Sequence, residues 1–465
     1  MRQRKVRWVL VLQLATLGFV LAAVAGAGGP VVVPTAEGQI GEVPESGTSL
    51  GGFRVESIRG TFADVLFGGT RFRPAMAPEM AILNDVIHET ADPQELDILP
   101  IELTTVAEVT PGSSRRRNAA DDGDFVVFSF AVDGAMPQTL AVRIATYDES
   151  GQSLLSVPII DNIPTAPFPD VILAGTDVGI DDEGRVTVVY TDIPPGGFAE
   201  IRGQRIDGAT GNVIDPSFLI SPPGRADPSV ALLDPAGNRL VVTATNLPQI
   251  VGNIVDTAGP SPVVSPEFTI STTAASFGNL LPEVAADPEG GDFLVVWEHL
   301  DDAPGDPVNV RGRRFDADGN PIGGDFVVNT TTVNAQGQPA VAYGPDGLSA
   351  VVWAGDSSVQ GDELDVYLQV YDADGNPIGG ETRANTVTSG VQDRPGVNFP
   401  PQPDDQGRPQ VLVTWRDVGT ADGGNPRGTG STYRCFSIDG LEDPTAIFAD
   451  GFESGDTSSW SDSRP

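Results

Sequence analysis

The sequence has few of the residues that build most catalytic and metal centres. Cys435 is its only cysteine, which excludes an intrachain disulfide, a paired-cysteine zinc site and a CxxC redox centre. Two histidines, His88 and His299, leave little room for histidine-based metal sites or catalytic triads. Cys435 lies in an apolar segment, so we expect a buried and unreactive thiol.

Positive charge is scarce as well. Lys5 is the only lysine, and 27 basic residues face 64 acidic ones, which gives a formal net charge of −37. Nucleic acids and anionic membranes are bound through Lys and Arg, so this balance argues against both as partners. A hydrophobic content of 40% provides enough material for a core and excludes wholesale disorder.

The N-terminus has the three parts of a secretory signal. Basic residues precede an apolar stretch over 8–24, and small residues follow up to Ala27. We therefore predict a cleaved signal peptide over 1–27 and a protein that is secreted or held at the cell surface or in the periplasm. The alternative is an uncleaved anchor, because the apolar run is near the lower length limit for a spanning helix. No second apolar run has that length, so no membrane span is expected after cleavage.

Residues 28–100 are predicted to be a linker and irregular segment with one short helix over 75–88, and internal repetition begins after them. Residues 310–324 and 366–380 both end in Asp-Ala-Asp-Gly-Asn-Pro-Ile-Gly-Gly. One marker, the end of an apolar strand, recurs at Phe128, Tyr190, Thr243, Trp297, Trp353 and Trp415. A second marker recurs at Asp148, Asp207, Asp256, Asp316, Asp372 and Asp439. Both markers give six units.

Each unit reads as four short strands, A to D. In the fourth unit these are expected over 281–286, 293–297, 308–316 and 326–329. Strand B is apolar at every position, so both of its faces must be buried. Four-stranded units of about 55 residues that stack on both faces indicate an all-β fold, a six-bladed β-propeller. Tandem β-sandwich domains are the alternative.

We place the propeller at 101–440 and a tail at 441–465. The sixth unit stops without a D strand, and residues 101–109 form an extra strand candidate upstream of the first unit. We expect this strand to pair with 432–438, because such closure removes two exposed sheet edges.

The repeat resembles one that is common in secreted bacterial proteins: an apolar strand ending in Trp, a Gln-Arg-Phe-Asp-Ala-Asp-Gly-Asn-Pro segment and a Val-Asn-Thr strand. Such repeats often accompany large surface or calcium-binding exported proteins, and the resemblance transfers no catalytic residue. The tail segment 448–461 is similar to a C-terminal segment of many secreted proteins of certain bacteria. It is either a sorting or anchoring signal or a docked or disordered end.

The repeated turns are the only metal candidates. They space oxygen-bearing side chains as calcium loops do but lack the distal glutamate, so plain hairpin turns are favoured over weak calcium binding. No other cofactor is expected. The candidate calcium ligands are Asp316, Asp318, Asn320, Asp372, Asp374 and Asn376.

No catalytic motif has the required context. A GxSxG match at 47–51 lies in the linker, and the metalloprotease pattern is absent around His88. We therefore expect a non-catalytic, monomeric binding protein for an unknown extracellular protein or glycan. Its binding residues are expected on long B–C connections over 298–307, 354–364 and 416–430.

The alternative function is a propeller hydrolase acting on extracellular glycans. Its paired carboxylates would come from acidic loops such as 301–302 or 362–363. The clustered arginines are expected on C strands, away from the axis; they are Arg202, Arg205, Arg311, Arg313 and Arg314.

Overall fold

The computed structural model describes residues 31–42, 109–111, 125–133, 139–148, 153–164 and, with gaps, 176–439. The predicted signal peptide, the helix over 75–88 and the tail lie outside these residues. The described part is built from strands and one short 3-10 helix, η3 (Pro345–Gly347). It contains no helix that is both long and apolar enough to cross a membrane.

The first three blades are separate antiparallel sheets. Blade 1 contains β2 (Val109–Pro111), β3 (Phe125–Asp133), β4 (Thr139–Asp148) and β5 (Ser153–Pro164). Blade 2 contains β6 (Thr176–Ile180), β7 (Arg185–Asp192), β8 (Glu200–Asp207) and β9 (Val213–Ser221). Blade 3 contains β10 (Ala226–Leu232), β11 (Arg239–Asn246), β12 (Gln249–Asp256) and an outer strand split into β13 (Val263–Val264) and β14 (Phe268–Thr269).

The last three blades complete the ring. Blade 4 contains β15 (Gly278–Ala286), β16 (Phe293–Ala303), β17 (Asp306–Phe315) and β18 (Pro321–Val327). Blade 5 contains β19 (Gln336–Tyr343), β20 (Ser349–Asp356), β21 (Leu364–Tyr371) and β22 (Pro377–Arg383). Blade 6 contains β23 (Val391–Asn398), β24 (Gln410–Val418), β25 (Thr429–Asp439) and β1 (Val31–Glu42). One parallel pair, Leu364 with Val391, joins blades 5 and 6.

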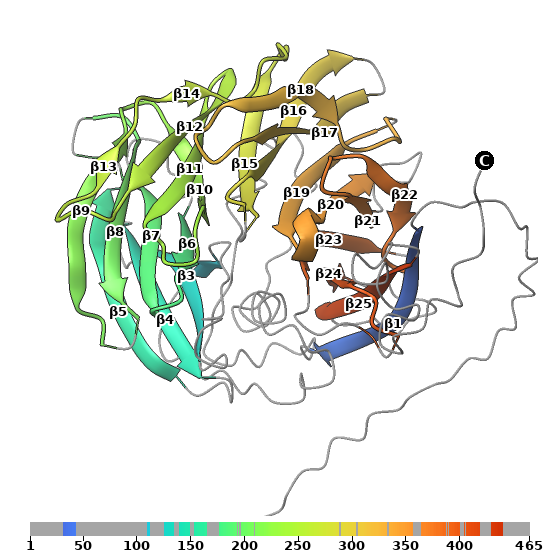
Figure 1. Ribbon diagram of the computed structural model, residues 1–465, viewed down its shortest axis with the longest axis horizontal. Helices are drawn as coiled ribbons and strands as arrows, with labels where there is room; N and C mark the ends of the chain where they lie inside the picture. The colour runs from blue at the N-terminus through green and yellow to red at the C-terminus, as the bar shows by residue number, and fades with distance from the viewer. Residues whose placement is uncertain are drawn as a thin grey trace, which may run out of the picture.

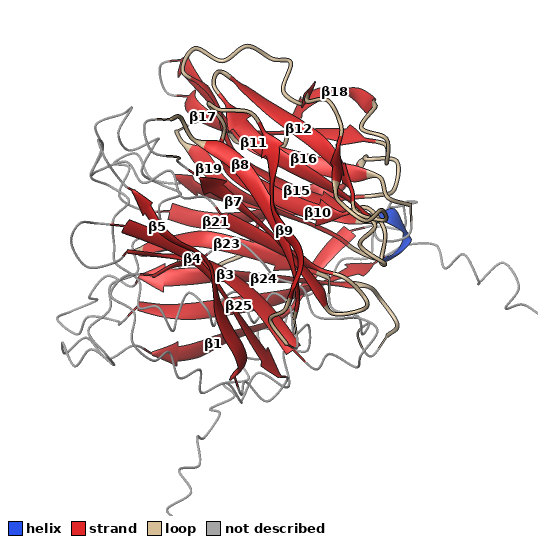
Figure 2. Ribbon diagram, turned by 90° about the vertical axis from the view of Figure 1, so that its left-hand side faces the viewer, coloured by secondary structure: helices blue, strands red, loops and turns tan. Residues whose placement is uncertain are grey.

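The blades stand in a ring, which confirms the predicted six-bladed propeller (Figure 1). The first strand of each blade is nearest the centre and the fourth is at the rim. Figure 2 shows the strands from the side, with η3 at one edge of the molecule. Since the strands alternate in direction, the B–C and D–A connections share one face. The A–B and C–D turns share the other.

The ring is closed by a different strand from the one we predicted. β1 pairs antiparallel with β25, from Val31 opposite Asp439 to Glu42 opposite Gly430. Of the predicted closing segment, only Val109 is described, and it begins the inner strand of blade 1. Residues 31–42, assigned to a linker, are therefore the fourth strand of blade 6. An outer strand tolerates Pro34, because it needs ladder hydrogen bonds on one side only.

Strand B is buried on both faces in blades 2 to 6, as its apolar composition predicts. Trp297, Trp353 and Trp415 are fully buried at the same position of β16, β20 and β24. Each of the first two indoles donates a hydrogen bond to an amide on strand A, Trp297 to Asn279 and Trp353 to Gln336. These bonds satisfy a donor that would otherwise be costly to bury. Cys435 is buried in β25.

Two details of the predicted strands differ in the structure. The pairing partners show that the residue equivalent to the tryptophans in blade 3 is Ala244, because Thr243 pairs with strand A as Val296 does in blade 4. The predicted long connection over 298–307 is mostly strand. β16 continues to Ala303 and β17 begins at Asp306, because backbone pairing extends past polar side chains.

Candidate active site

Five inner strands place one residue each at the same position relative to strand B. Each of these residues pairs with the strand B residue that directly precedes the buried tyrosine or tryptophan, or that precedes Ala244 in blade 3. The five residues are Asp177 on β6, Ser229 on β10, Glu283 on β15, Ala340 on β19 and Gly396 on β23. Three consecutive blades thus carry polar groups at this level, and the next two carry small residues.

A repeated β-bulge sets this position. Just before this position, β10, β15, β19 and β23 each contain one residue more than the facing segment of strand B. In three of these bulges a non-glycine residue has a positive φ of 50–53° directly before a proline: Asp227, Leu281 and Gln338. Such backbone costs about 1–3 kcal/mol per residue. An extra residue turns the following side chains to the opposite face of the strand, so the bulges direct Ser229 and Glu283.

The three polar residues form a chain of contacts across blades 2, 3 and 4. Ser229 Oγ lies 3.0 Å from Asp177 Oδ2 and 3.4 Å from Glu283 Oε2. The backbone N–H of Val230 also donates to Asp177 Oδ2, and that of Val178 donates to Asp177 Oδ1, both at 2.9 Å. All three side chains are buried, with exposed fractions of 3%, 1% and 5%.

The single proton of Ser229 suggests different roles for the two acids. A hydroxyl has one donor and two acceptor sites. Val284 N–H donates to Ser229 Oγ at 3.2 Å, and the shorter contact of the hydroxyl is to Asp177. Asp177 thus accepts from three donors, the Ser229 hydroxyl and the backbone N–H groups of Val178 and Val230, and these favour its ionised form. Glu283 makes only the longer contact with the Ser229 hydroxyl.

A pocket opens on the face of the B–C and D–A connections. Phe198 and Ala199 line it from blade 2, Asp227 and Leu247 from blade 3, and Leu280 from blade 4. Asp227 and Leu280 lie on the same strands as Ser229 and Glu283, a few residues nearer to this face.

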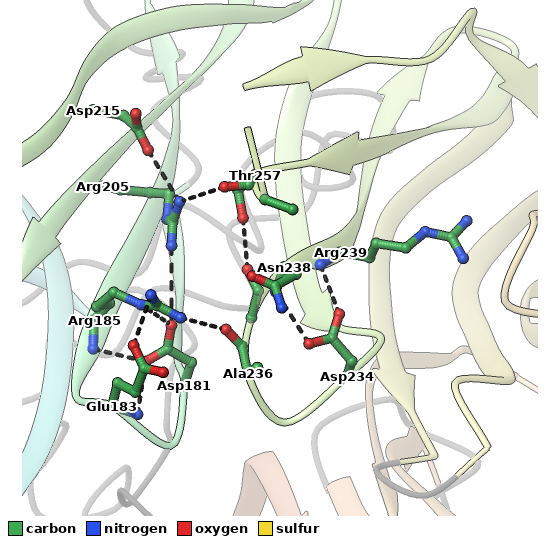
Figure 3. A network of polar contacts seen from close by, with 12 residues as sticks. Asp181, Glu183, Arg185, Arg205, Asp215, Asp234, Ala236, Asn238, Arg239 and Thr257 are labelled. Carbon is green, nitrogen blue, oxygen red and sulfur yellow. Dashed lines mark hydrogen bonds and ion pairs between the residues drawn. The ribbon is translucent and has the colours of Figure 1, made fainter. Parts of the chain in front are cut away.

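The opposite face holds blades 2 and 3 together through arginines (Figure 3). Arg205 is buried and donates to Asp215 Oδ2 at 3.1 Å and to the carbonyl oxygen of Thr257. Arg185 donates to Asp181 Oδ2 and to the carbonyl of Ala236 in the next blade. Arg205, on the third strand of blade 2, thus links blades 2 and 3.

The calcium candidates lie in the C–D turns of blades 4 and 5. Asp316 Oδ1 accepts from the backbone N–H groups of Asp318 and Asn320, and Oδ2 accepts from Asn320 Nδ2. These hydrogen bonds, led by that of the Asn320 side chain, hold the pKa of Asp316 below its usual value. Asp372 and Asn376 repeat the arrangement, and Asp374 lies in the same turn.

Turn geometry thus accounts for the carboxylate oxygens of Asp316 and Asp372. Asp318 accepts from Arg239 of blade 3. Within the described residues, no group of three or more His, Cys, Asp or Glu side chains could hold a metal ion.

Of the carboxylates named from the sequence, Asp301 accepts a hydrogen bond from Ser276. Residues 362–363 lie outside the described part of the chain. Asp177, Ser229 and Glu283 were not among the residues predicted from the sequence. A signal for two of them was present, because Pro228 and Pro282 occupy equivalent places in their repeats, as do Pro339 and Pro395.

No protein-family model matches the chain, and no curated protein matches it. Solved structures do. The α-L-arabinofuranosidase Arb93A from Fusarium graminearum is 14% identical, with a TM-score of 0.43, and the match covers 67% of this chain and 90% of that one. A Penicillium chrysogenum α-L-arabinanase is 14% identical, with a TM-score of 0.42 and coverage of 70% and 92%. The Dos1 propeller is 13% identical, with a TM-score of 0.36 and coverage of 72% and 79%.

These neighbours correct the expectation of a non-catalytic binding protein. Six of the matching solved structures are of arabinofuranosidases or arabinanases, whereas we expected a non-catalytic binding protein. At identities of 10–14% the likeness shows the fold alone. The case for catalysis therefore has to come from the side chains of this chain.

Proposed function

We propose that the protein is a propeller glycoside hydrolase that acts on extracellular glycans, with Asp177 and Glu283 as its two catalytic carboxyl groups. The observation that carries the proposal is their shared contact with Ser229 on neighbouring inner strands. Glycoside hydrolysis requires one carboxyl group that donates a proton and one that stays ionised. The different hydrogen bonding of the two residues supports this division.

In the proposed reaction, Glu283 protonates the oxygen of the leaving sugar. Asp177 stays ionised through its donors, Ser229 and the N–H groups of Val178 and Val230, and attacks the anomeric carbon as the bond to the leaving sugar breaks. Water, deprotonated by the Glu283 carboxylate, then displaces the sugar from Asp177 and restores the proton of Glu283. Contacts of 3.0 and 3.4 Å to the same hydroxyl oxygen keep the facing carboxyl oxygens at most about 6.4 Å apart. That spacing is closer to the retaining geometry than to the inverting one, so we expect retention of the anomeric configuration.

The test is turnover of chromogenic glycosides, arabinofuranosides among them, and of neutral polysaccharides by the chain without residues 1–27. Glu283→Gln and Asp177→Asn should each lower kcat by about 100-fold or more. Glu183→Gln, an exposed carboxylate at the opposite face, is the control and should leave kcat unchanged. Circular dichroism and thermal unfolding check that each variant folds. The proposal fails if no substrate is turned over, or if folded variants of both residues keep wild-type rates.

A further inference from the structure

The pocket beside the inner strands is an exposed apolar site on an otherwise strongly acidic protein. Phe198 is 76% exposed and Leu247 is 46% exposed, although both line it. Large apolar side chains exposed together, with polar groups around them, commonly mark binding sites. The pocket has a volume of about 200 Å³. Sites for drug-sized molecules have about 300 Å³ or more, so this one suits a single ring.

A fixed arginine forms the polar side of the pocket. Arg225 Nε and Nη2 donate to the two oxygens of Glu267, at 2.9 and 2.7 Å, and Nη1 donates to the carbonyl of Pro223. These contacts use three of the five guanidinium N–H bonds. These contacts leave two N–H bonds of a guanidinium whose position is fixed. Because Glu267 balances the charge of Arg225, the site does not favour an anion.

The wall of the pocket is held rigid. The carbonyl of Ala199 accepts from the backbone N–H groups of Gly224 and Arg225, which ties the B–C connection of blade 2 to the strand entry of blade 3. On the other side, Thr245 Oγ1 accepts from Leu281 N–H in the bulge that precedes Glu283. The pocket is therefore coupled to the strand that carries the proposed acid.

We propose that this pocket is a subsite for an uncharged sugar ring, stacked on Phe198 and hydrogen-bonded by Arg225 and Asp227. The inference rests on the proposed function, for which it identifies neutral rather than uronate glycans as the substrate class. An aromatic face suits the apolar C–H face of a sugar, and a donor beside an acceptor suits neighbouring hydroxyls. Repulsion from a chain of net charge −37 disfavours uronates.

The test separates binding from turnover. Calorimetry on Glu283→Gln protein measures binding of neutral pentose and hexose tetrasaccharides, with tetragalacturonate as the charged comparison. We expect a neutral tetrasaccharide to bind, and Phe198→Ala to weaken binding about tenfold or more while Phe198→Trp retains it. Val263→Ala, which removes an exposed side chain on the outer strand of blade 3, is the matched control. Kinetics of Phe198→Ala in the otherwise unchanged chain should show a raised KM and a nearly unchanged kcat.

The outcomes are distinguishable. Binding that depends on Phe198 without hydrolysis of any glycan refutes the proposed function and leaves the subsite standing. Hydrolysis with a KM that Phe198→Ala does not change refutes the subsite alone. Failure of all neutral tetrasaccharides to bind at about 1 mM, or a preference for tetragalacturonate, also refutes the subsite.

Discussion

The indole Nε1 of Trp297 donates a 2.9 Å hydrogen bond to Oδ1 of Asn279, and the same oxygen lies 2.9 Å from Nδ1 of His299. Asn279 also donates to the carbonyl of Pro248 in blade 3. One buried amide thus connects strands A and B of blade 4 with the preceding blade.

Asn279→Ala should therefore destabilise the protein by about 1–3 kcal/mol, because it leaves a buried indole donor without its acceptor. Urea unfolding followed by tryptophan fluorescence measures the effect. Asn212→Ala, at an exposed residue, serves as the comparison for a generic loss of an amide. Equal effects at both positions would contradict the role assigned to Asn279.

Removing residues 1–42 should lower the unfolding temperature and promote aggregation, whereas removing only 1–30 should not. The longer deletion takes away β1, exposes the edge of β25 and uncovers the blade 6 core, against which Val32 packs. Thermal unfolding and light scattering of the two truncated chains test this. Similar behaviour of both chains would show that the closing strand contributes little.

Asp404 should make stability depend on pH at the acid end. Burial alone would raise its pKa, but hydrogen bonds from Arg408 and Ser437 outweigh burial and hold the pKa well below its usual range. A lowered pKa in the folded state stabilises the protein above about pH 4 and loses this effect as the pH falls further.

Asp404→Asn should thus lower the urea midpoint at pH 7 and flatten its fall on acidification. Asp346→Asn, in the turn of η3, is the isosteric control. An unchanged pH profile for Asp404→Asn would refute the assignment.

Calcium, magnesium and additional sodium chloride at matched ionic strength should raise the melting temperature by similar amounts. The oxygens of Asp316 and Asp372 already accept hydrogen bonds from their own turns, so diffuse screening of the acidic surface is the expected effect. A shift of several degrees that is selective for calcium and is lost in the Asp316→Ala, Asp372→Ala double variant would contradict this and indicate specific sites.

The fold could be predicted because its determinants are local and repeated. Trp297, Trp353 and Trp415 end apolar runs that are buried on both faces, and Asp-Gly turns recur at similar distances from them. The closing strand could not, since residues 31–42 contain Pro34 and lie in a Gly- and Pro-rich region, whereas 101–109 has a better strand pattern. Which of two weak segments pairs with β25 depends on tertiary contacts.

The candidate site was less predictable than the fold. Asp177, Ser229 and Glu283 are different residue types, so no single letter recurs at their position. With 64 acidic residues in the chain, composition cannot single out two of them. The repeats share a proline directly before the position of these residues, as at Pro228 and Pro282. This proline indicates the site only once the β-bulge in which it lies is known.

The pairing of β1 with β25 has a consequence for the order of assembly. The strand that completes the ring, β1, is synthesised before every other described strand, and its partner β25 after all of them. Until then blade 6 has an open edge, and the early segment has to avoid pairing elsewhere. Contacts between residues so far apart in sequence form slowly, because a long loop has to close first. Ring closure should therefore be the last and slowest step of folding, with the five preceding blades already in place.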